Sequence, residues 1–345
     1  MQVNMQNSKR LIRCKAPLRI SFAGGGTDVS PYCDERGGAV LNSTIDHFAY
    51  CTISPRSDNQ ATIRSLDYET IQKWKTGETL TYDGNLDLIK AVVNHFNITE
   101  GFDMFLHCSA PPGSGLGSSS AVIVSIIGAV SEWLNESLNQ YEIANLAYVL
   151  ERKELKLSGG KQDQYAAVFG GFNFMEFNSS RTLVTPLRVK TDILNELNYV
   201  MLLANTGKTR DSGNIIKSQT EGYINGNSKT AEALDNAKRL AEEMKNSLLK
   251  GEIRQMGELL NEAWMYKKNY TSNISNEYID KIYDRALASG AVGGKISGAG
   301  GGGFMFFICD YDKKRDVARE LTTLGANVVE YNFEKHGLQT WRFTQ

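Results

Sequence analysis

The feature that most constrains this chain is a glycine- and serine-rich loop between two apolar segments. Residues 111–120 read P-P-G-S-G-L-G-S-S-S, a strand signal over 102–109 precedes them, and an apolar run over 121–130 follows. A glycine loop that opens a helix presents free backbone N–H groups, and the positive end of the helix dipole favours anions there. The pattern predicts a phosphate-binding loop, although a plain turn with a serine N-cap is the alternative.

This loop matches neither of the two commonest nucleotide-binding motifs. The dinucleotide fingerprint needs G-x-G-x-x-G, and here the third glycine comes one residue early. The second motif is G-x-x-x-x-G-K-[ST]. Gly207-Lys208-Thr209 matches the end of this motif, but Leu202 occupies the position of the first glycine. The assignment of the loop therefore depends on other parts of the chain.

Length and composition limit the fold and the partners. The chain has 345 residues, of which 41% are hydrophobic and 22% charged, so we expect a globular protein of two domains. We place the boundary near residue 190, which gives domains 1–190 and 191–345. The net charge of -1, from 38 basic and 39 acidic residues, disfavours nucleic acid as a partner.

Cysteine usage and hydropathy predict the compartment. The cysteines are odd in number and form no C-x-x-C pair, and in a chain with a large core this predicts reduced thiols; they are Cys14, Cys33, Cys51, Cys108 and Cys309. The first ten residues are polar and do not resemble a signal peptide. The longest apolar run, 121–130, is about half of what a membrane span needs. We expect a cytoplasmic protein without membrane partners, either a monomer or a homodimer.

Local patterns predict the order of the elements. In the first half the expected strands are 11–14 and 18–23 on either side of Pro17, then 48–54 and 102–109, and the expected helices are 118–134 and 141–157. Polar residues 178–181 are expected to lead out of this half. In the second half the expected elements are strand 199–204, amphipathic helix 229–250, strand 304–309, a helix near 315–324 and a terminal strand.

Two further glycine clusters flank the loop. Residues 16–28 read A-P-L-R-I-S-F-A-G-G-G-T-D, and residues 295–304 read K-I-S-G-A-G-G-G-G-F. Each alone is more typical of a tight turn than of a site. Together with the loop, they resemble the three signature motifs of the GHMP kinase superfamily, over Lys15 to Phe304. The resemblance implies an ATP-dependent small-molecule kinase of α+β fold. Its N-terminal domain would be like ribosomal protein S5 domain 2, its C-terminal domain ferredoxin-like, with ATP between them.

The motif variants narrow the substrate that the resemblance implies. G-G-G-T-D at 24–28 differs from the G-E-H-T-D of galactokinases, and G-G-K-Q-D-Q-Y-A-A at 159–167 is similar to the heptose 7-phosphate kinase and fucokinase branch. Fucokinases are usually longer or fused, so the length favours the heptose branch. The expected reaction is phosphorylation of the anomeric hydroxyl of D-glycero-D-manno-heptose 7-phosphate. The alternatives are another sugar-1-kinase, an ATP-using decarboxylase of the superfamily and a non-catalytic sugar-binding module.

The resemblance also implies roles in phosphoryl transfer. Asp163 would orient or deprotonate the acceptor hydroxyl, and Arg19 would lie near the transferred group; an N-cap and a buried ion pair are their structural alternatives. Ser119 and Glu151 would bind Mg²⁺, with Ser118 and Glu154 as competitors and a solvated helix face as the structural alternative. The residues expected to bind ATP are Pro112, Gly113, Ser114, Gly115, Leu116, Gly117, Ser118, Ser119 and Ser120.

The residues expected to contact the acceptor come from several segments of the chain. Thr27 and Asp28 are candidates to hold sugar hydroxyls, although an Asx-turn would equally explain Asp28. The complete set expected to contact the sugar phosphate is Gly26, Thr27, Asp28, Gly300, Gly301, Lys208 and Arg210. In this set Lys208 and Arg210 would clamp the 7-phosphate, but basic residues on an exposed loop usually bind nothing specific.

Overall fold

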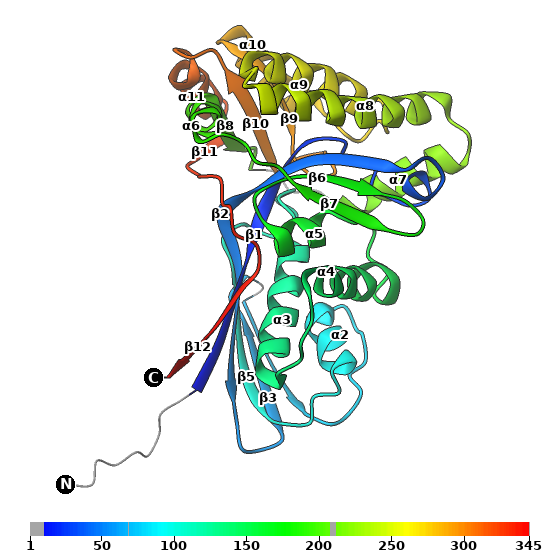
Figure 1. Ribbon diagram of the computed structural model, residues 1–345, viewed down its shortest axis with the longest axis vertical. Coiled ribbons are helices and arrows are strands. Elements are labelled where there is room, and N and C mark those ends of the chain that lie inside the picture. Colours follow the sequence, from blue (N-terminus) through cyan, green and yellow to red (C-terminus); the bar gives the residue numbers. More distant parts are fainter. Residues whose placement is uncertain (1–9, 68, 208–211, 345) are drawn as a thin grey trace, which may run out of the picture.

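The computed structural model describes residues 10–67, 69–207 and 212–344. Within these residues the strands form two sheets, and Figure 1 shows the smaller one above the larger. The larger sheet has the strand order β12-β1-β2-β5-β3-β4, with β6 paired to β2 and β7 paired to β6. Its strands are β1 (Arg10–Ala23), β2 (Gly38–Pro55), β3 (Gln60–Ser65), β4 (Thr70–Lys75), β5 (Phe102–Cys108), β6 (Phe172–Phe177), β7 (Thr182–Pro186) and β12 (Gln339–Thr344).

Strand β1 is continuous where the sequence suggested two strands. The antiparallel register between β1 and β2 shifts between Pro17 and Leu18, and pairing then resumes to Ala23. Proline has no N–H to give to a ladder, so a bulge at that residue lets the strand continue. Strand β2 is long enough to pair with β6 through its first part and with β5 through its last.

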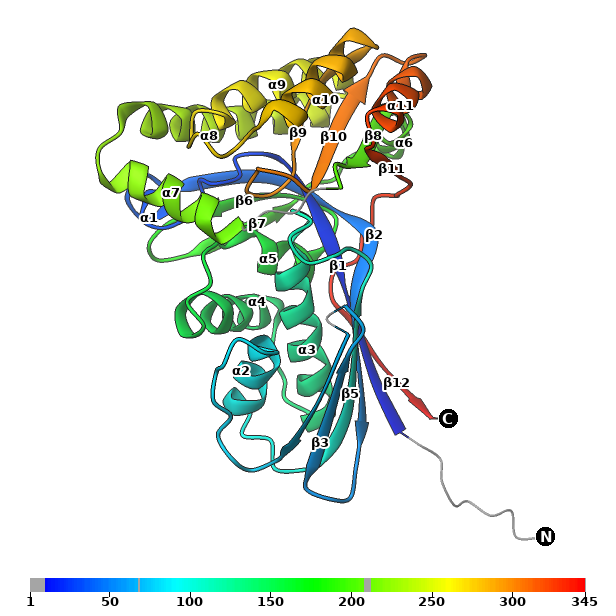
Figure 2. The same cartoon turned by 180° about the vertical axis from the view of Figure 1, so that it is seen from behind.

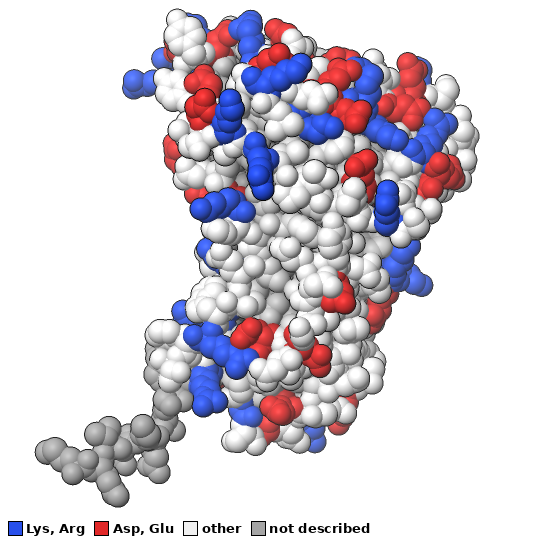
Figure 3. Space-filling view, in the orientation of Figure 1, with Lys and Arg blue, Asp and Glu red and all other residues white. Residues whose placement is uncertain are grey.

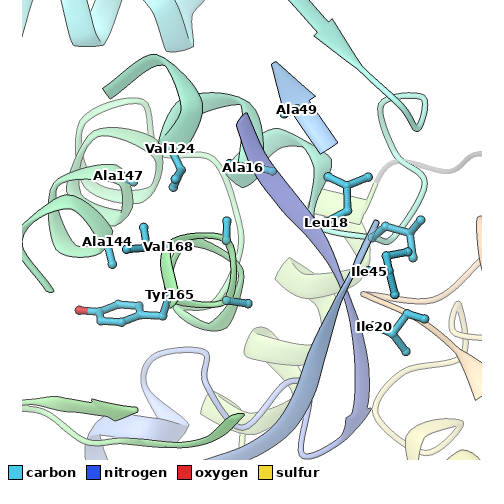
Figure 4. Packing of buried hydrophobic residues seen from close by; sticks show 14 of the residues in the cluster. Ala16, Leu18, Ile20, Ile45, Ala49, Val124, Ala144, Ala147, Tyr165 and Val168 are labelled. Atoms are coloured by element: carbon cyan, nitrogen blue, oxygen red, sulfur yellow. The ribbon is translucent and has the colours of Figure 1, made fainter. Parts of the chain in front are cut away.

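Helices cover one face of the larger sheet. Helix α3 (Ser118–Leu134) has the bounds predicted from its apolar run and packs against β1 and β2. The helices around it are α2 (Asp87–His95), α4 (Gln140–Tyr148) and α5 (Gln162–Phe169). Figure 4 shows Val124 of α3 between Ala16 of β1 and the alanines of α4, with Tyr165 of α5 nearby. This packing fixes the position of α3, the helix that directly follows the glycine loop.

The second predicted helix, 141–157, is shorter than expected. It is α4 as far as Tyr148, and a π-helical turn, η1 (Val149–Glu154), follows. A π-helical turn is one wider turn within an α-helix, and such turns are frequent at functional sites. The turn contains Glu151, whose side chain is fully buried.

The smaller sheet is antiparallel, in the order β11-β8-β10-β9. Its strands are β8 (Met201–Asn205), β9 (Ala291–Ile296), β10 (Phe304–Cys309) and β11 (Asn327–Val329). The remaining helices are α1 (Tyr32–Arg36), α6 (Thr191–Val200), α7 (Ser212–Ile224), α8 (Ser228–Lys250), α9 (Ile253–Lys267), α10 (Glu277–Ala288) and α11 (Lys314–Thr323). Two sheets, each with its own helices, confirm the predicted α+β class. The boundary near residue 190 remains a prediction.

Two connections differ from their sequence-based expectations. Residues 178–181 close the β6–β7 hairpin, where Asn178 Oδ1 accepts hydrogen bonds from the N–H groups of Ser180 and Arg181, so they do not lead out of the first half. The terminal strand β12 was expected in the second domain, but it pairs with β1 at the edge of the larger sheet. Figure 1 shows this red strand beside the blue first strand. Hydrophobic patterning predicts a strand but not its partner.

The expectations from composition concern the cysteines, the helices and the surface charges. All five cysteines are buried and free of disulfides. None of the helices in the described ranges is long and apolar enough to cross a membrane. On the face in Figure 3, basic and acidic side chains mingle over the upper part of the molecule. No single sign of charge dominates that part of the face.

Candidate active site

The three glycine-rich segments meet at one cleft of about 290 Å³. Residues of the first segment, the loop before α3, the Gly159–Asp163 turn and helices α7 and α9 line it. Figure 2 shows α7 on the same side of the molecule as α4 and α5, below α8 and α9. The cleft is therefore formed by both halves of the chain.

The loop before α3 places most of its predicted residues in this cleft. Gly117 is the N-cap of α3, with a φ of 76° in the left-handed region that favours glycine. The loop residues that line the cleft are Gly113, Gly115, Gly117, Ser118, Ser119 and Ser120. Pro112 is exposed away from it, whereas Ser114 and Leu116 are buried behind it. No serine side chain caps α3, so the loop differs from the plain turn with a serine N-cap that was its structural alternative.

The third glycine segment supports this loop from behind. A Cβ at Gly298 would lie 2.7 Å from the carbonyl oxygen of Gly115, so only glycine allows the two backbones to come this close. The Phe304 N–H also donates to the Ser114 carbonyl at 3.0 Å. Gly298 lines the cleft, but Gly300 and Gly301 do not, and the structure does not bring these two predicted substrate contacts to it. The Gly301 N–H instead donates to the carbonyl of Ile274.

Arg19 and Asp163, the two predicted catalytic residues, form an ion pair in the cleft. Arg19 Nε and Nη2 lie 2.8 and 2.7 Å from Asp163 Oδ1, and Nη1 donates to the carbonyl of Gly115 at 2.6 Å. The arginine is buried, whereas the carboxylate keeps 20% of its side-chain surface exposed. The buried ion pair that was the structural alternative for Arg19 and the proposed site are thus the same feature. Arg19 links the candidate base to the loop before α3, the predicted phosphate loop.

Glu151 is held by a ring of donors beside the loop. Its Oε1 accepts a hydrogen bond from Ser119 Oγ at 2.6 Å, and its Oε2 accepts from Ser120 Oγ at 2.7 Å and Gln164 Nε2 at 2.6 Å. Arg152 lies 3.3 Å from Oε1. Gly117 occupies the N-cap position of α3, so Ser119 and Ser120 lie within the first turn, where their hydroxyls bond this carboxylate instead.

The oxygens of Ser119 and Glu151 fit Mg²⁺. Carboxylate and hydroxyl oxygens are hard ligands, and this ion is often bound by one or two protein groups together with substrate phosphates and water. Across the described ranges, no cluster of three or more His, Cys, Asp or Glu side chains gathers to hold a metal. Such a small donor set suits a metal that arrives with a nucleotide. The competing carboxylate, Glu154, instead bonds the hydroxyl of Tyr82.

Of the predicted sugar contacts in the first glycine segment, two line the cleft and one does not. Asp28 lines the cleft, and its carboxylate accepts hydrogen bonds from the N–H groups of Gly26 and Gln162 at 3.1 and 3.0 Å. Burial raises the pKa of the Asp28 carboxyl. Thr27 is fully buried and its hydroxyl bonds to the backbone of Gly24 and Ala39, so the structure does not place its side chain as a substrate contact. Gly26 itself lines the cleft.

Comparison with known proteins decides the family. Residues 86–171 match the GHMP kinases N terminal domain, and residues 234–327 match the GHMP kinases C terminal domain. The chain is 40% identical over 339 residues to the D-glycero-alpha-D-manno-heptose 7-phosphate kinase of Campylobacter jejuni, which covers 96% of this chain and 99% of that protein. The chain belongs to the GHMP kinases. This membership confirms the resemblance of its glycine motifs, and it makes the protein an ATP-dependent phosphotransferase with a hydroxyl acceptor.

Two other relatives place this GHMP kinase more finely. The crystal structure of a D-glycero-D-manno-heptose 1-phosphate kinase from Bacteroides thetaiotaomicron has a TM-score of 0.82 and 37% identity, covering 97% of this chain and 100% of that one. The bifunctional fucokinase/GDP-fucose pyrophosphorylase of Arabidopsis thaliana is 25% identical over 90% of this chain, but only over 31% of its own length. Nearly the whole of this GHMP kinase thus matches heptose phosphate kinases.

Several cleft residues of this GHMP kinase were missed in the sequence. Lys267 is the last residue of α9, Tyr270 lies in the turn that follows it, and Gln219 comes from α7. The Tyr270 hydroxyl donates to the Gly25 carbonyl and Gln219 Nε2 to the Gly26 carbonyl, both at 3.2 Å. The second half thereby holds the first glycine turn in place.

One of these residues had a signal in the sequence. Lys267 falls on the apolar stripe of α9, at helical spacing from Leu260, Ala263 and Trp264. A lysine on a buried stripe needs a polar environment, because burying a charge in an apolar one is unfavourable. Gln162 gave no comparable signal; its side-chain oxygen is buried, lines the cleft and has no partner in the described parts of the chain. Lys208 and Arg210 lie outside the described residues.

Proposed function

We propose that this GHMP kinase transfers the γ-phosphoryl group of ATP to the anomeric hydroxyl of D-glycero-D-manno-heptose 7-phosphate. The observation that carries the proposal is the Arg19–Asp163 pair, set between the phosphate loop and the Gly26–Asp28 turn. The 40% identity to a heptose 7-phosphate kinase over nearly the whole of both chains supports the choice of acceptor.

The chain's own residues would act through position and charge, as phosphoryl transfer requires. Asp163 accepts the proton of the anomeric hydroxyl while that oxygen forms a bond to the γ-phosphorus. The bond between the γ-phosphorus and the β,γ-bridging oxygen breaks, and ADP leaves. Arg19 holds the carboxylate and places positive charge beside the loop at Gly115. Asp28 and Gln162 would accept hydrogen bonds from sugar hydroxyls.

Ser119 and Glu151 would hold Mg²⁺ in this reaction. When bound, the ion neutralises charge on the nucleotide's β- and γ-phosphates. The hydrogen bond from Ser119 to Glu151 holds Ser119 Oγ and Glu151 Oε1 together beside the phosphate loop, where they would bind a nucleotide-bound ion. The buried carboxylate is kept in place by Ser120 and Gln164, which remain as its partners on the other oxygen.

Two other acceptors follow from the named relatives. A fucokinase-like activity is the second candidate, and a heptose 1-phosphate acceptor would require that another hydroxyl be phosphorylated. The test is a panel of ADP-release assays with heptose 7-phosphate, heptose 1-phosphate, fucose, galactose and mevalonate. We expect the highest kcat/KM with heptose 7-phosphate and a product with a new anomeric phosphate in the ³¹P spectrum. A higher value for fucose or the 1-phosphate would replace this proposal, and no acceptor-dependent release would favour a binding module.

We also infer that the protein works in the cytoplasm, as a monomer or a homodimer. Five buried free thiols suit a reducing compartment, where disulfides are rare. Light scattering coupled to size-exclusion chromatography gives the oligomeric state, and a mass above that of two chains would contradict the inference.

A further inference from the structure

Lys267, the last residue of α9, is a buried cation that opens into the cleft. Only 5% of the residue is exposed, yet it is among the cleft-lining residues. Its Nζ donates a hydrogen bond to the carbonyl oxygen of Gly298. Among the residues that the structure describes, no carboxylate forms an ion pair with it. A buried ammonium whose protein partner is a single neutral carbonyl retains donors for a ligand.

A purely structural role would look different in this molecule. Lys295, on β9, is buried to a similar degree, and its Nζ donates to the carbonyl of Ser21 at 2.8 Å. That lysine lies behind the site and does not line the cleft. Lys267 shares its burial but faces the space where substrates would bind. The comparison separates a cation that ties two segments together from one that is open to a ligand.

The surroundings of Lys267 locate the part of the substrate that it would meet. Its hydrogen-bond partner, Gly298, packs directly against Gly115 of the phosphate loop. Arg19 also donates to Gly115, and the Arg19 charge repels that of Lys267. The two cations are thus bonded to neighbouring backbone segments, Arg19 to Gly115 and Lys267 to Gly298, and together they create a site for a strongly anionic group. Asp28 lies close enough to exert a compensating attraction.

We propose that Lys267 is a further catalytic residue, which binds the transferring phosphoryl group opposite Arg19. The inference rests on the proposed kinase function and adds a contribution from the second half of the chain. In the transfer, the bond between the acceptor oxygen and the γ-phosphorus forms, the bond to the β,γ-bridging oxygen breaks, and the acceptor proton goes to Asp163. Lys267 donates hydrogen bonds to the γ-phosphoryl oxygens throughout and exchanges no proton in the step.

The charge of Lys267 is sensitive to what occupies the cleft. Burial lowers the pKa of its ammonium to about 7, and the neighbouring Arg19 charge acts in the same direction. The charged groups around it are Arg19 on β1, Lys295 on β9 and Asp28 after the first glycine turn. Tyr270 is also nearby, and burial raises the pKa of its hydroxyl, which stays neutral. An incoming phosphoryl dianion favours the ammonium, so the lysine should take up a proton when nucleotide binds.

The first experiment compares Lys267→Met, Lys267→Arg and the control Lys268→Met in steady-state kinetics. Lys268 is the next residue, but its side chain lies over Trp264 and near Asp280. We expect Lys267→Met to lower kcat by roughly 100-fold, as for removal of one transition-state donor. Lys268→Met should stay near wild type. In the wild type, kcat/KM should fall above pH 7, and Lys267→Arg should lose this decline because arginine stays charged. An unchanged kcat in Lys267→Met, or an unchanged decline in Lys267→Arg, would overturn the proposal.

The second experiment does not depend on the identity of the acceptor. Binding of the magnesium complex of a non-hydrolysable ATP analogue is measured by calorimetry at pH 8 in buffers of different ionisation enthalpy. We expect the wild type to take up nearly one proton and Lys267→Met to take up almost none. If heptose 7-phosphate proves not to be the acceptor, this result still stands and only the substrate proposal fails. Equal uptake by both proteins would refute the role of Lys267 even in an active heptose kinase.

Discussion

Arg19 and Asp163 are 144 residues apart in the sequence, yet two nitrogens of the arginine contact the same carboxylate oxygen, Oδ1. The other oxygen, Oδ2, makes no hydrogen bond with Arg19, and it lies 3.4 Å from where a Cβ on Gly117 would be. The arginine therefore fixes the carboxylate through one oxygen and leaves the other next to the phosphate loop. This arrangement suits a base that must point at a hydroxyl beside a bound nucleotide.

Replacing Asp163 with Asn should abolish most of the turnover. The amide keeps the size of the side chain but does not accept the acceptor proton, so kcat should fall by about 10²- to 10⁴-fold. Binding of an ATP analogue, measured by calorimetry, should change little because the phosphate loop is intact. Turnover within a few-fold of wild type would show that Asp163 is not the base.

Glu151→Gln should raise the Mg²⁺ concentration needed for half-maximal activity. The neutral amide removes the buried carboxylate beside Ser119, and we expect a shift of about 10- to 100-fold, as for other changes around metal ligands. Glu154→Gln is the matched control because Glu154 is exposed on the same turn and bonds Tyr82. A larger shift in the control than in Glu151→Gln would move the metal site to Glu154.

Gly298→Ala should damage the phosphate loop. A methyl group there would meet the Gly115 backbone, and its φ of 73° disfavours alanine, which together should cost about 1–3 kcal/mol of stability. Gly84→Ala is the control because its φ is 87° but nothing lies within 4 Å of the added methyl. We expect both variants to lower the urea midpoint and only Gly298→Ala to raise the KM for ATP. A normal KM in Gly298→Ala would mean that the loop does not depend on this contact.

Lys267→Met should change how stability depends on pH. The folded-state pKa of about 7 lies below the ordinary value of 10.5, so the unfolded chain binds more protons between these values. Wild-type stability contributed by this group therefore rises with pH from about 7 to about 10.5. Below pH 7 the lysine is charged in the folded state, so its burial lowers the free energy of unfolding of the wild type the most. The Tm of the Met variant should therefore exceed that of the wild type by the largest margin below pH 7. The margin should shrink by pH 9, and a constant margin would contradict the assigned pKa.

Arg210→Ala tests the sequence-based clamp for the substrate's own phosphate. If Arg210 binds the 7-phosphate, the KM for the phosphorylated heptose should rise several-fold more than the KM for an unphosphorylated sugar. The loss of one charge-assisted hydrogen bond to phosphate supports this size of effect. Equal increases for both sugars would remove Arg210, and with it the clamp, from the substrate site.

Local patterns predicted the elements better than their partners. Helix α3 has the predicted bounds because its apolar run, the preceding glycine and the left-handed Asn135 at its end are all local features. The break at Pro17 was also predicted from the local sequence, but β1 pairs with β2 on both sides of this proline and is therefore one strand. The place of β12 was wrong because the hydrophobic pattern of a strand does not indicate which edge it joins.

The site shows the same division. Gly117, Asp163 and Asp28 could be predicted from motifs, since each lies on a segment that the family resemblance covers. Thr27 follows the same motif, but the turn directs its hydroxyl to backbone groups of Gly24 and Ala39. The burial of Lys267 had a local signal in the apolar stripe of α9, but its place in the cleft depends on how the two halves pack, and no local pattern predicts that packing.

The pairing of β12 with β1 also affects how the protein can fold during synthesis. Lys15 pairs with Gln339 and Arg10 with Thr344, so β1 leaves the ribosome long before its partner strand β12 is translated. Until then one edge of β1 stays open, and such edges are prone to pair with other chains. Closing so large a loop is entropically slow. Nascent chains stalled before β12 should therefore need chaperone protection.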